Sequence, residues 1–185
     1  MAILKVARMG HPVLREVCRD LSPEEIRSDR FRQLVSDMRN TMLEYGGVGI
    51  AAPQVHEPVR IALIEFAADN PRYAVAEPQP LVVLFNARVT VLDGTTSGFW
   101  EGCLSLPGLR GYVERPSKVQ VDYLDENAEP RRVSAEGFRA TVCQHELDHL
   151  DGVLYIDRIR DHSKLTYSEE YERFHLGDVT PDEDE

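Results

Sequence analysis

Hydrophobic residues recur every three or four positions in one early stretch of the chain, a spacing typical of an amphipathic helix. Ser22, Pro23 and Glu25 supply an N-cap, a first-turn proline and a capping-box carboxylate at its start. The apolar face of this helix comprises Phe31, Leu34, Val35, Met38 and Met42. The glycine pair at 46–47 then predicts where the helix ends.

The middle of the chain alternates between apolar and polar positions, or is rich in Val, Leu and Phe, as β-strands are. Strands are predicted at 61–66, at 81–92 around Asn86, and at 119–123, from which a turn at 125–128 leads into a strand at 131–133. Gly, Pro, Asn and Asp predict loops at 67–80 and 93–98. The glycines and alanines of 47–55 leave the backbone nearly bare, which suits close approach of another chain or ligand, with a tightly packed loop as the alternative. The middle of the chain is therefore expected to be mostly antiparallel sheet.

A second helix is predicted from about residue 135 to residue 150, and a short one near 168–172. One side of the longer helix carries Phe138, Val142, His145 and His149. Two imidazoles therefore face inward among apolar side chains, whereas Cys143 lies off this side and is interpreted as a small buried hydrophobe. Strands followed by one inward-facing helix predict an α+β fold, with antiparallel strands around a central helix.

Length and composition fit one globular domain over residues 1–176, followed by an acidic tail at 177–185 that is expected to be disordered. The net charge of −11 argues against nucleic-acid binding, because phosphate contacts need clustered Lys and Arg. No apolar run approaches the roughly 20 residues of a membrane span, so no membrane association is expected. Three cysteines are too few for a disulfide framework, which favours the reducing cytoplasm.

The sequence from His145 to His149, His-Glu-Leu-Asp-His, lies within the predicted second helix. On a helix these two histidines are one turn apart on the same face, where their imidazoles can bind one metal ion. Glu146 stands beside the first histidine, where a carboxylate can reach water at that ion. The alternative is an amphipathic helix with two exposed or core histidines, because this short pattern also occurs by chance.

Cys103, in the stretch from Trp100 to Pro107, is the candidate for a third metal ligand. A lone cysteine beside glycine is usually structural, but with the two histidines it completes three protein ligands, the number that a catalytic site uses. One thiolate and two imidazoles fit zinc, iron(II) or another divalent ion and disfavour magnesium and calcium. No fourth ligand stands nearby with suitable spacing, which favours catalysis. The central helix is thus predicted to be a metal-binding helix.

Three motifs now resemble, in their order and separation, the signature motifs of bacterial peptide deformylases. They are Gly47-Val48-Gly49-Ile50-Ala51-Ala52-Pro53-Gln54, Glu101-Gly102-Cys103-Leu104-Ser105 and Gln144-His145-Glu146-Leu147-Asp148-His149. The resemblance extends from about Ile3 to Ile159, although the loop at 67–80 looks longer than in compact members. It implies a single catalytic domain that removes the formyl group from the N-terminal formylmethionine of newly made proteins. Formate would be released by attack of a metal-bound water.

The resemblance also implies roles for individual residues. Cys103, His145 and His149 would bind one divalent ion, iron(II) natively, with zinc, nickel or cobalt as alternatives in a purified sample. Glu146 would transfer protons, while the Gln54 side chain and the Leu104 backbone N–H would stabilise charge on the formyl oxygen. Glu101 and Asp148 are candidates for hydrogen-bonding partners of this group, with surface charge as the alternative.

Substrate contacts follow from the same resemblance. The peptide would lie as an added strand beside Gly47, Val48 and Gly49. Its methionine would meet apolar walls formed by Val48, Phe138 and Val142, with Arg110 near the peptide. The expected partners are N-formylmethionyl nascent peptides, with a transient ribosome contact.

Two other functions fit parts of the sequence. A zinc endopeptidase also uses the His-Glu-x-x-His pattern, but it takes a third His or Glu downstream, and none stands at a convincing spacing after His149. A metal-stabilised binding module without catalysis would need the same ligands but not Glu146.

Overall fold

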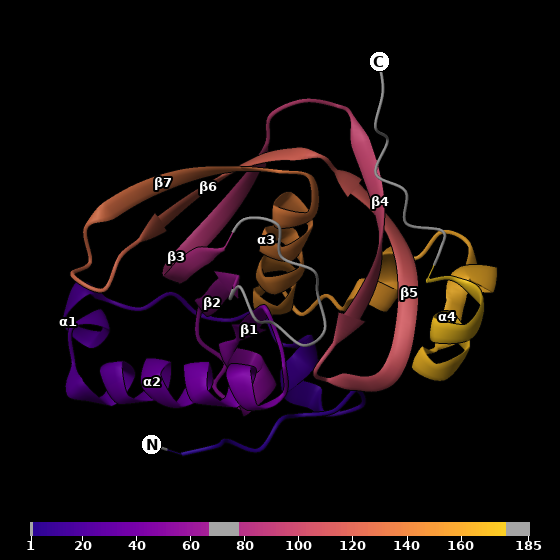
Figure 1. Ribbon diagram of the computed structural model, residues 1–185. Helices are drawn as coiled ribbons and strands as arrows, with labels where there is room; N and C mark the ends of the chain where they lie inside the picture. The colour runs from indigo at the N-terminus through magenta and orange to yellow at the C-terminus, as the bar shows by residue number, and fades with distance from the viewer. Residues whose placement is uncertain (1, 67–77, 177–185) are drawn as a thin grey trace.

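The computed structural model describes residues 2–66 and 78–176 of the protein, in which two antiparallel sheets and three α-helices are arranged around a fourth, central α-helix (Figure 1). The α-helices are α1 (Pro23–Ile26), α2 (Asp29–Glu44), α3 (Gly137–Leu150) and α4 (Ser168–Phe174). The strands are β1 (Gly49–Ala51), β2 (Ile61–Phe66), β3 (Gln79–Val91), β4 (Thr96–Cys103), β5 (Leu106–Pro116), β6 (Lys118–Leu124), β7 (Pro130–Glu136) and β8 (Leu165–Tyr167). Short 3-10 helices are η1 (Pro12–Arg15), η2 (Ala52–Val55), η3 (Tyr155–Arg158) and η4 (His162–Lys164).

A five-stranded sheet, in the order β1-β2-β3-β6-β7, separates α3 from α2 (Figure 1). Successive side chains of a strand point to opposite faces of its sheet, and β2 carries apolar side chains on both faces. Ala62 and Ile64 pack in the core cluster that contains α3, whereas Ile61 and Leu63 pack with α2. Burial on both faces explains why β2 is a nearly continuous apolar run.

A three-stranded sheet, in the order β4-β5-β8, covers another side of α3, and α4 lies beside it (Figure 1). β4 and β5 form a hairpin whose turn falls between Cys103 and Leu106. Both residues pack in a third core cluster with Leu14, Val113 and Tyr155. The hairpin therefore fixes Cys103 against the interior, close to the C-terminal half of α3.

The predicted α+β class, with antiparallel strands around a central helix, is confirmed, and several element boundaries need correction. The first predicted helix is two helices, because α1 ends after Ile26 and Ser28, in extended conformation, precedes α2. The capping box at Ser22 and Glu25 is present, and Gly46 adopts a left-handed φ of 65° just after α2.

Two segments that were not predicted as strands contain them. Residues 49–51 form the edge strand β1, and the loop expected at 93–98 ends where β4 begins, at Thr96. The hairpin that β4 and β5 form was not predicted from the sequence. Residues 67–77 of the loop expected at 67–80, and the acidic tail at 177–185, lie outside the described residues.

Within the described ranges, no helix has both the length and the apolar character that crossing a bilayer would require.

Candidate metal centre and active site

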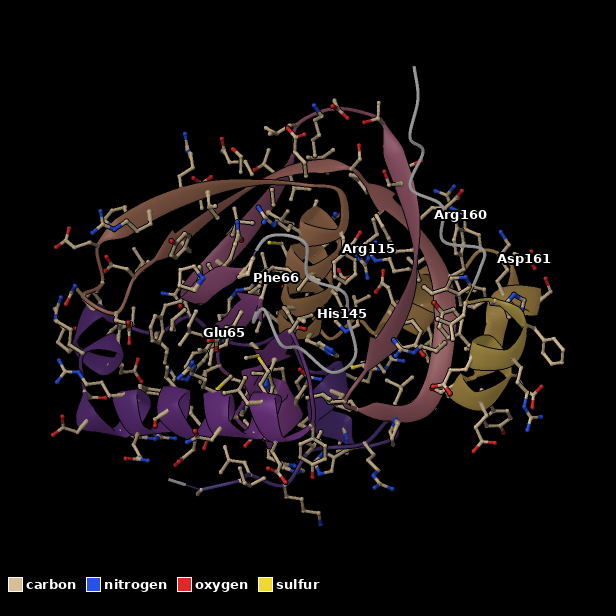
Figure 2. The ribbon with its side chains drawn as sticks, viewed as in Figure 1. Glu65, Phe66, Arg115, His145, Arg160 and Asp161 are labelled. Carbon is tan, nitrogen blue, oxygen red and sulfur yellow. The ribbon has the colours of Figure 1, made fainter. Side chains whose placement is uncertain are left out.

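Helix α3 carries His145 and His149 one turn apart. The centroids of their two imidazole rings are 5.1 Å apart. Every residue of α3 from Ala140 to Leu150 is buried, because strands of both sheets surround the helix. The inward orientation expected for both imidazoles is therefore what the structure has. Figure 2 shows His145 projecting from α3 toward the β4–β5 side of the molecule.

Cys103, at the end of β4, meets the two histidines although it lies more than forty residues earlier in the chain. Its Sγ is 3.3 Å from His149 Nε2, and the ligand atoms of Cys103, His145 and His149 all lie within 4.8 Å of one another. Two ligands of one tetrahedral ion stand about 3.5 Å apart, given metal–nitrogen and metal–sulfur bonds of about 2.1 and 2.3 Å. One thiol and two imidazoles at this spacing fit a borderline-soft divalent ion.

A chain of ionic hydrogen bonds, buried except at its outer end at Arg158, supports His145 from behind. Glu101 Oε2 lies 2.7 Å from His145 Nδ1, so the other ring nitrogen, Nε2, is left for the ligand group. Arg115 binds Glu101 through Nε and Nη2 at 2.6 and 3.0 Å, and its Nη1 donates to Asp148 at 2.7 Å. Arg158 completes the chain with two further hydrogen bonds to Asp148, at 2.6 and 3.0 Å. Figure 2 shows Arg115 close to His145 beside α3.

The charges in this chain shift the pKa values of its members. Burial alone would raise the pKa of Glu101, but hydrogen bonds from His145 and Arg115 outweigh burial and hold it below its usual range. Burial opposes charge on His145, yet Cys103 and Glu101 together raise its pKa well above the ordinary value. Burial lowers the pKa of His149, with the nearby His145 adding to the effect. Binding of a cation at these imidazoles therefore competes with protons.

Glu146 shares a pocket with Cys103 and His145, and its carboxylate lies against the backbone of Gly49 in β1. A Cβ atom at Gly49 would stand 2.5 Å from Glu146 Oε1 and 2.7 Å from Cδ, so only glycine leaves room for this carboxylate. Burial raises the pKa of Glu146 to about 7. Its Oε2 is buried and has no hydrogen-bond partner among the described residues, so this oxygen is available to a ligand.

Gln54, at the end of η2, points its amide nitrogen at the same group. The backbone N–H of Ala51 donates to Gln54 Oε1 at 2.8 Å, which fixes the orientation of the amide. Gln54 Nε2 then donates to Cys103 Sγ and to Ser105 Oγ, both at 3.3 Å. One small pocket is lined by Gly47, Val48, Gly49, Gln54, Gly102, Cys103, Leu104, His145 and Glu146.

The residues expected to hold methionine gather in a neighbouring pocket. Val48, Phe138 and Val142 line it together with Trp100, Thr141 and the Glu146 side of α3. Arg110 does not line either pocket. It lies over Gly102, where an added Cβ would stand 2.6 Å from its guanidinium, and it is 5.7 Å from the ring of Tyr171.

Arg115 and Tyr155 are neighbours of the site that the sequence motifs did not reveal. Tyr155, in η3, stacks on His145 with 6.0 Å between ring centroids and an interplanar angle of 19°. The sequence carries one signal for Arg115. It stands two positions after Val113, and because residues i and i+2 of a strand lie on the same face, Arg115 falls on the face that packs in the core. A charged residue at such a position needs a buried counter-charge, which Glu101 provides.

Residues 3–165 match the family model of polypeptide deformylase. This chain belongs to the polypeptide deformylase family. The match includes the α3 motif, the Cys103 hairpin and the Gln54 segment, and it agrees with the extent expected from the sequence motifs.

Similar proteins and solved structures point to the same family. A peptide deformylase of Leptospira biflexa is 42% identical over 170 residues, covering 92% of this chain and 95% of the relative. A class I type b peptide deformylase from Acinetobacter baumannii, solved with Met-Ala-Ser bound, has a TM-score of 0.81 at 39% identity, covering 85% of this chain and 99% of that one. A peptide deformylase from Synechococcus elongatus, solved in complex with actinonin, has a TM-score of 0.78 at 36% identity. The match covers 89% of this chain and 82% of that one.

The expectation of a hydrolase that acts on formylmethionyl peptides agrees with these findings, and a metal-dependent reaction is consistent with the family and with the thiol–imidazole group. Deformylases of this family are enzymes, so the non-catalytic binding module no longer describes the chain.

Proposed function

We propose that Cys103, His145 and His149 hold the divalent ion with which this peptide deformylase releases formate from N-formylmethionyl peptides. The observation that carries the proposal is the juxtaposition of these three buried ligand atoms with the carboxylate of Glu146. Three protein ligands leave a position for substrate or water, as a catalytic site requires.

The donor set fits iron(II), zinc, nickel or cobalt, and the resemblance to bacterial peptide deformylases implies iron(II) as the native ion, with the others as substitutes in a purified sample. When bound, such an ion acts as a Lewis acid that makes water more acidic near neutral pH and polarises a carbonyl group. The protein's own part begins with orientation. Glu101, hydrogen-bonded to His145 Nδ1, orients that imidazole so that its Nε2 atom is directed to the site.

Glu146 is proposed to move the protons of the reaction. One of its carboxylate oxygens accepts a proton from the attacking water, and the same carboxyl group then delivers it to the departing amine nitrogen. The partnerless Oε2 supports this role, because a buried acceptor without an internal partner is free to engage a ligand. General acid–base catalysis of this kind typically contributes a factor of about 100 to 10,000.

Gln54 and Leu104 are proposed to stabilise the formyl oxygen as it gains negative charge. The Gln54 amide is preorganised, since Ala51 holds its oxygen and leaves its nitrogen facing Cys103 and Ser105. The backbone N–H of Leu104 follows Cys103 directly and belongs to the same pocket lining. Loss of one such donor typically costs about 3 kcal/mol of barrier height.

The substrate is proposed to bind between two strand edges. β1 and β4 are both terminal strands of their sheets, and Val48, beside β1, shares a pocket with Trp100 and Gly102 of β4. A peptide laid beside Gly47, Val48 and Gly49 could hydrogen-bond as an added strand. Its methionine would then enter the pocket of Val48, Phe138 and Val142, with Arg110 near the peptide. The Met-Ala-Ser complex of the Acinetobacter relative supports a short methionyl peptide as ligand.

We further propose that residues 1–176 form a single catalytic domain and that the enzyme meets nascent chains in the cytoplasm through transient contact with the ribosome. The buried cysteines without disulfides support a reducing compartment.

Metal analysis combined with a formate-release assay tests the proposal. The native protein should contain about one divalent ion per chain and release formate without cutting internal peptide bonds, whereas Cys103→Ala should lose both ion and activity. Cys18→Ala is the matched control, because Cys18 is also a buried cysteine but does not belong to the group of three ligand candidates. Full metal content and activity in Cys103→Ala would refute the ligand assignment, and internal cleavage would indicate an endopeptidase.

A further inference from the structure

A cleft of about 630 Å³ opens beside the active-site pocket, on the side of the N-terminal segment. Cys103 and Leu104 line both this cleft and the pocket that contains Glu146, so the two spaces adjoin. Its other walls include Lys5, Arg8, His11 and His56. A volume of this size falls in the range of ligand sites, which is about 300 to 1,000 Å³.

The charge of this cleft is opposite to that of the molecule. The chain has 32 acidic and 21 basic residues, yet no carboxylate is among the described residues that line the cleft. Lys5 and Arg8 have no ion-pair partner within the described ranges, whereas Arg15, Arg19, Arg30, Arg39, Arg60, Arg88 and Arg115 are each paired with a carboxylate. Two unpaired cations in one concave surface attract an anionic ligand.

The backbone holds these cations in a fixed relation to the active site. Ala7 N donates to Gln54 O, and Met9 N donates to Ser105 O, both at 2.8 Å. Arg8 stands between these two anchors, and each anchor ends at a segment that belongs to the catalytic pocket. The N-terminal segment therefore positions its side chains relative to the bound peptide.

We propose that this cleft receives the part of the formylated peptide that follows its methionine, and that Lys5 and Arg8 make the enzyme favour substrates with an acidic side chain there. The inference rests on the proposed function, because it takes formylmethionine to lie beside Glu146. The adjoining walls at Cys103 and Leu104 would allow one extended peptide to occupy both spaces. Exposed charge pairs of this kind change a binding constant about 2- to 5-fold each.

Deformylation of matched peptides tests this selectivity. A set of formyl-Met peptides carries one Glu at the second, third, fourth or fifth residue, and a second set carries Gln in its place. At about 20 mM salt, Glu at one or two adjacent positions should raise kcat/KM about 2- to 5-fold over Gln, mainly through KM. At about 500 mM salt the Glu-to-Gln ratio should approach one, because added ions screen exposed charges.

Variants assign the effect to the cleft. Lys5→Gln and Arg8→Gln should each reduce the Glu-to-Gln ratio, and the double variant should bring it close to one. Arg132→Gln is the matched control, since it removes the same charge from β7, across the molecule from the N-terminal segment (Figure 1), and should keep the ratio.

The two levels of the hypothesis fail differently. An enzyme that releases formate from all peptides but with a ratio near one at every position, or with a ratio that the double variant leaves unchanged, would overturn the selectivity. Absence of formate release from every peptide by a metal-loaded, folded protein would instead refute the proposed function.

Discussion

Arg115 and Glu101 form a two-pronged ion pair directly behind His145, with N–O distances of 2.6 and 3.0 Å and both side chains almost fully buried. The pair joins the β4–β5 hairpin, which carries Cys103, to helix α3, which carries the two histidines, because Arg115 also binds Asp148. The same side chain thus holds two elements whose alignment determines the spacing of the three ligand atoms. Its contribution is positional, since its hydrogen bonds go to Glu101 and Asp148 rather than to any of the three ligand atoms.

Replacement of Arg115 by Met should therefore weaken both the fold and the metal site. Removing one partner of a buried ion pair typically costs about 3 to 5 kcal/mol, because Glu101 and Asp148 would lose their buried counter-charge. Loss of the partner that orients a metal-binding histidine typically lowers metal affinity about 10- to 100-fold. Urea unfolding and competition with a chelator measure the two effects. Arg160→Met, which breaks an exposed pair with Glu114, should change neither; equal metal affinity in both variants would contradict the positioning role.

Replacement of Glu146 by Gln should abolish most of the activity while leaving the ion in place. The amide has nearly the same shape but cannot accept and return a proton, so formate release should fall by a factor of about 100 to 10,000. Metal content, measured on the same sample, should stay near that of the native protein, because Glu146 is not among the three ligand candidates. If the Gln variant kept its activity, proton transfer would have to be assigned to another group.

A methyl group added at Gly49 should act through Glu146. The new Cβ would overlap Oε1, Cδ and Cγ of that side chain at 2.5 to 2.7 Å, so the carboxylate must move. Gly49→Ala should consequently lose most of its deformylase activity and retain its metal. Gly94→Ala is the matched control, because a Cβ at Gly94 meets no atom within 4 Å and its φ is not left-handed. Similar rates for the two variants would show that the glycine serves some purpose other than space for Glu146.

The ion pair between Arg15 and Asp157 should give stability that depends on pH. Hydrogen bonding to Arg15 lowers the pKa of Asp157 despite the opposing effect of its partial burial. Because the folded-state pKa lies below the unfolded value of about 3.9, the contribution is complete above that value and disappears as pH falls through the folded-state pKa. For this largely exposed pair we expect about 1 kcal/mol at neutral pH.

Asp157→Asn and Arg15→Gln should therefore both be less stable than the native protein at pH 7, and this difference should disappear as the pH falls below the folded-state pKa of Asp157. Urea unfolding across this pH range measures the difference, and the double variant should lose no more than either single variant. A difference that stayed constant with pH would exclude the ion pair as its origin.

The sequence motifs were informative where the chemistry is local. The His-Glu-x-x-His spacing on a helix defines the relation of His145 to His149 by itself, and the Ser22 capping box marks a helix start with backbone contacts only three residues apart. The hairpin of β4 and β5 was harder to predict, because its glycines favour a loop. A Cβ atom at Gly98 would overlap the ring of Tyr112, and one at Gly102 would overlap Arg110. These glycines are therefore required by side chains that pack over them from β5, and not by a loop conformation.

Arg115 illustrates a second kind of limit. Its partners lie 14 and 33 residues away along the chain, and only the pairing of β4 with β5 and the packing of α3 bring them together. A pattern along one segment does not specify contacts between segments. The break between α1 and α2 does carry a signal in the sequence, since no apolar residue lies between Ile26 and Phe31, a gap wider than the helical spacing of three or four.

The chain has a single tryptophan, and Trp100 lines the pocket proposed for methionine while its ring also stands 5.2 Å from Tyr171 of α4. Its fluorescence is therefore an intrinsic optical signal for two events, the arrival of a thioether side chain and the undocking of the last helix. A titration followed at this one chromophore, compared between the intact protein and a form shortened before α4, would separate the two without any added label.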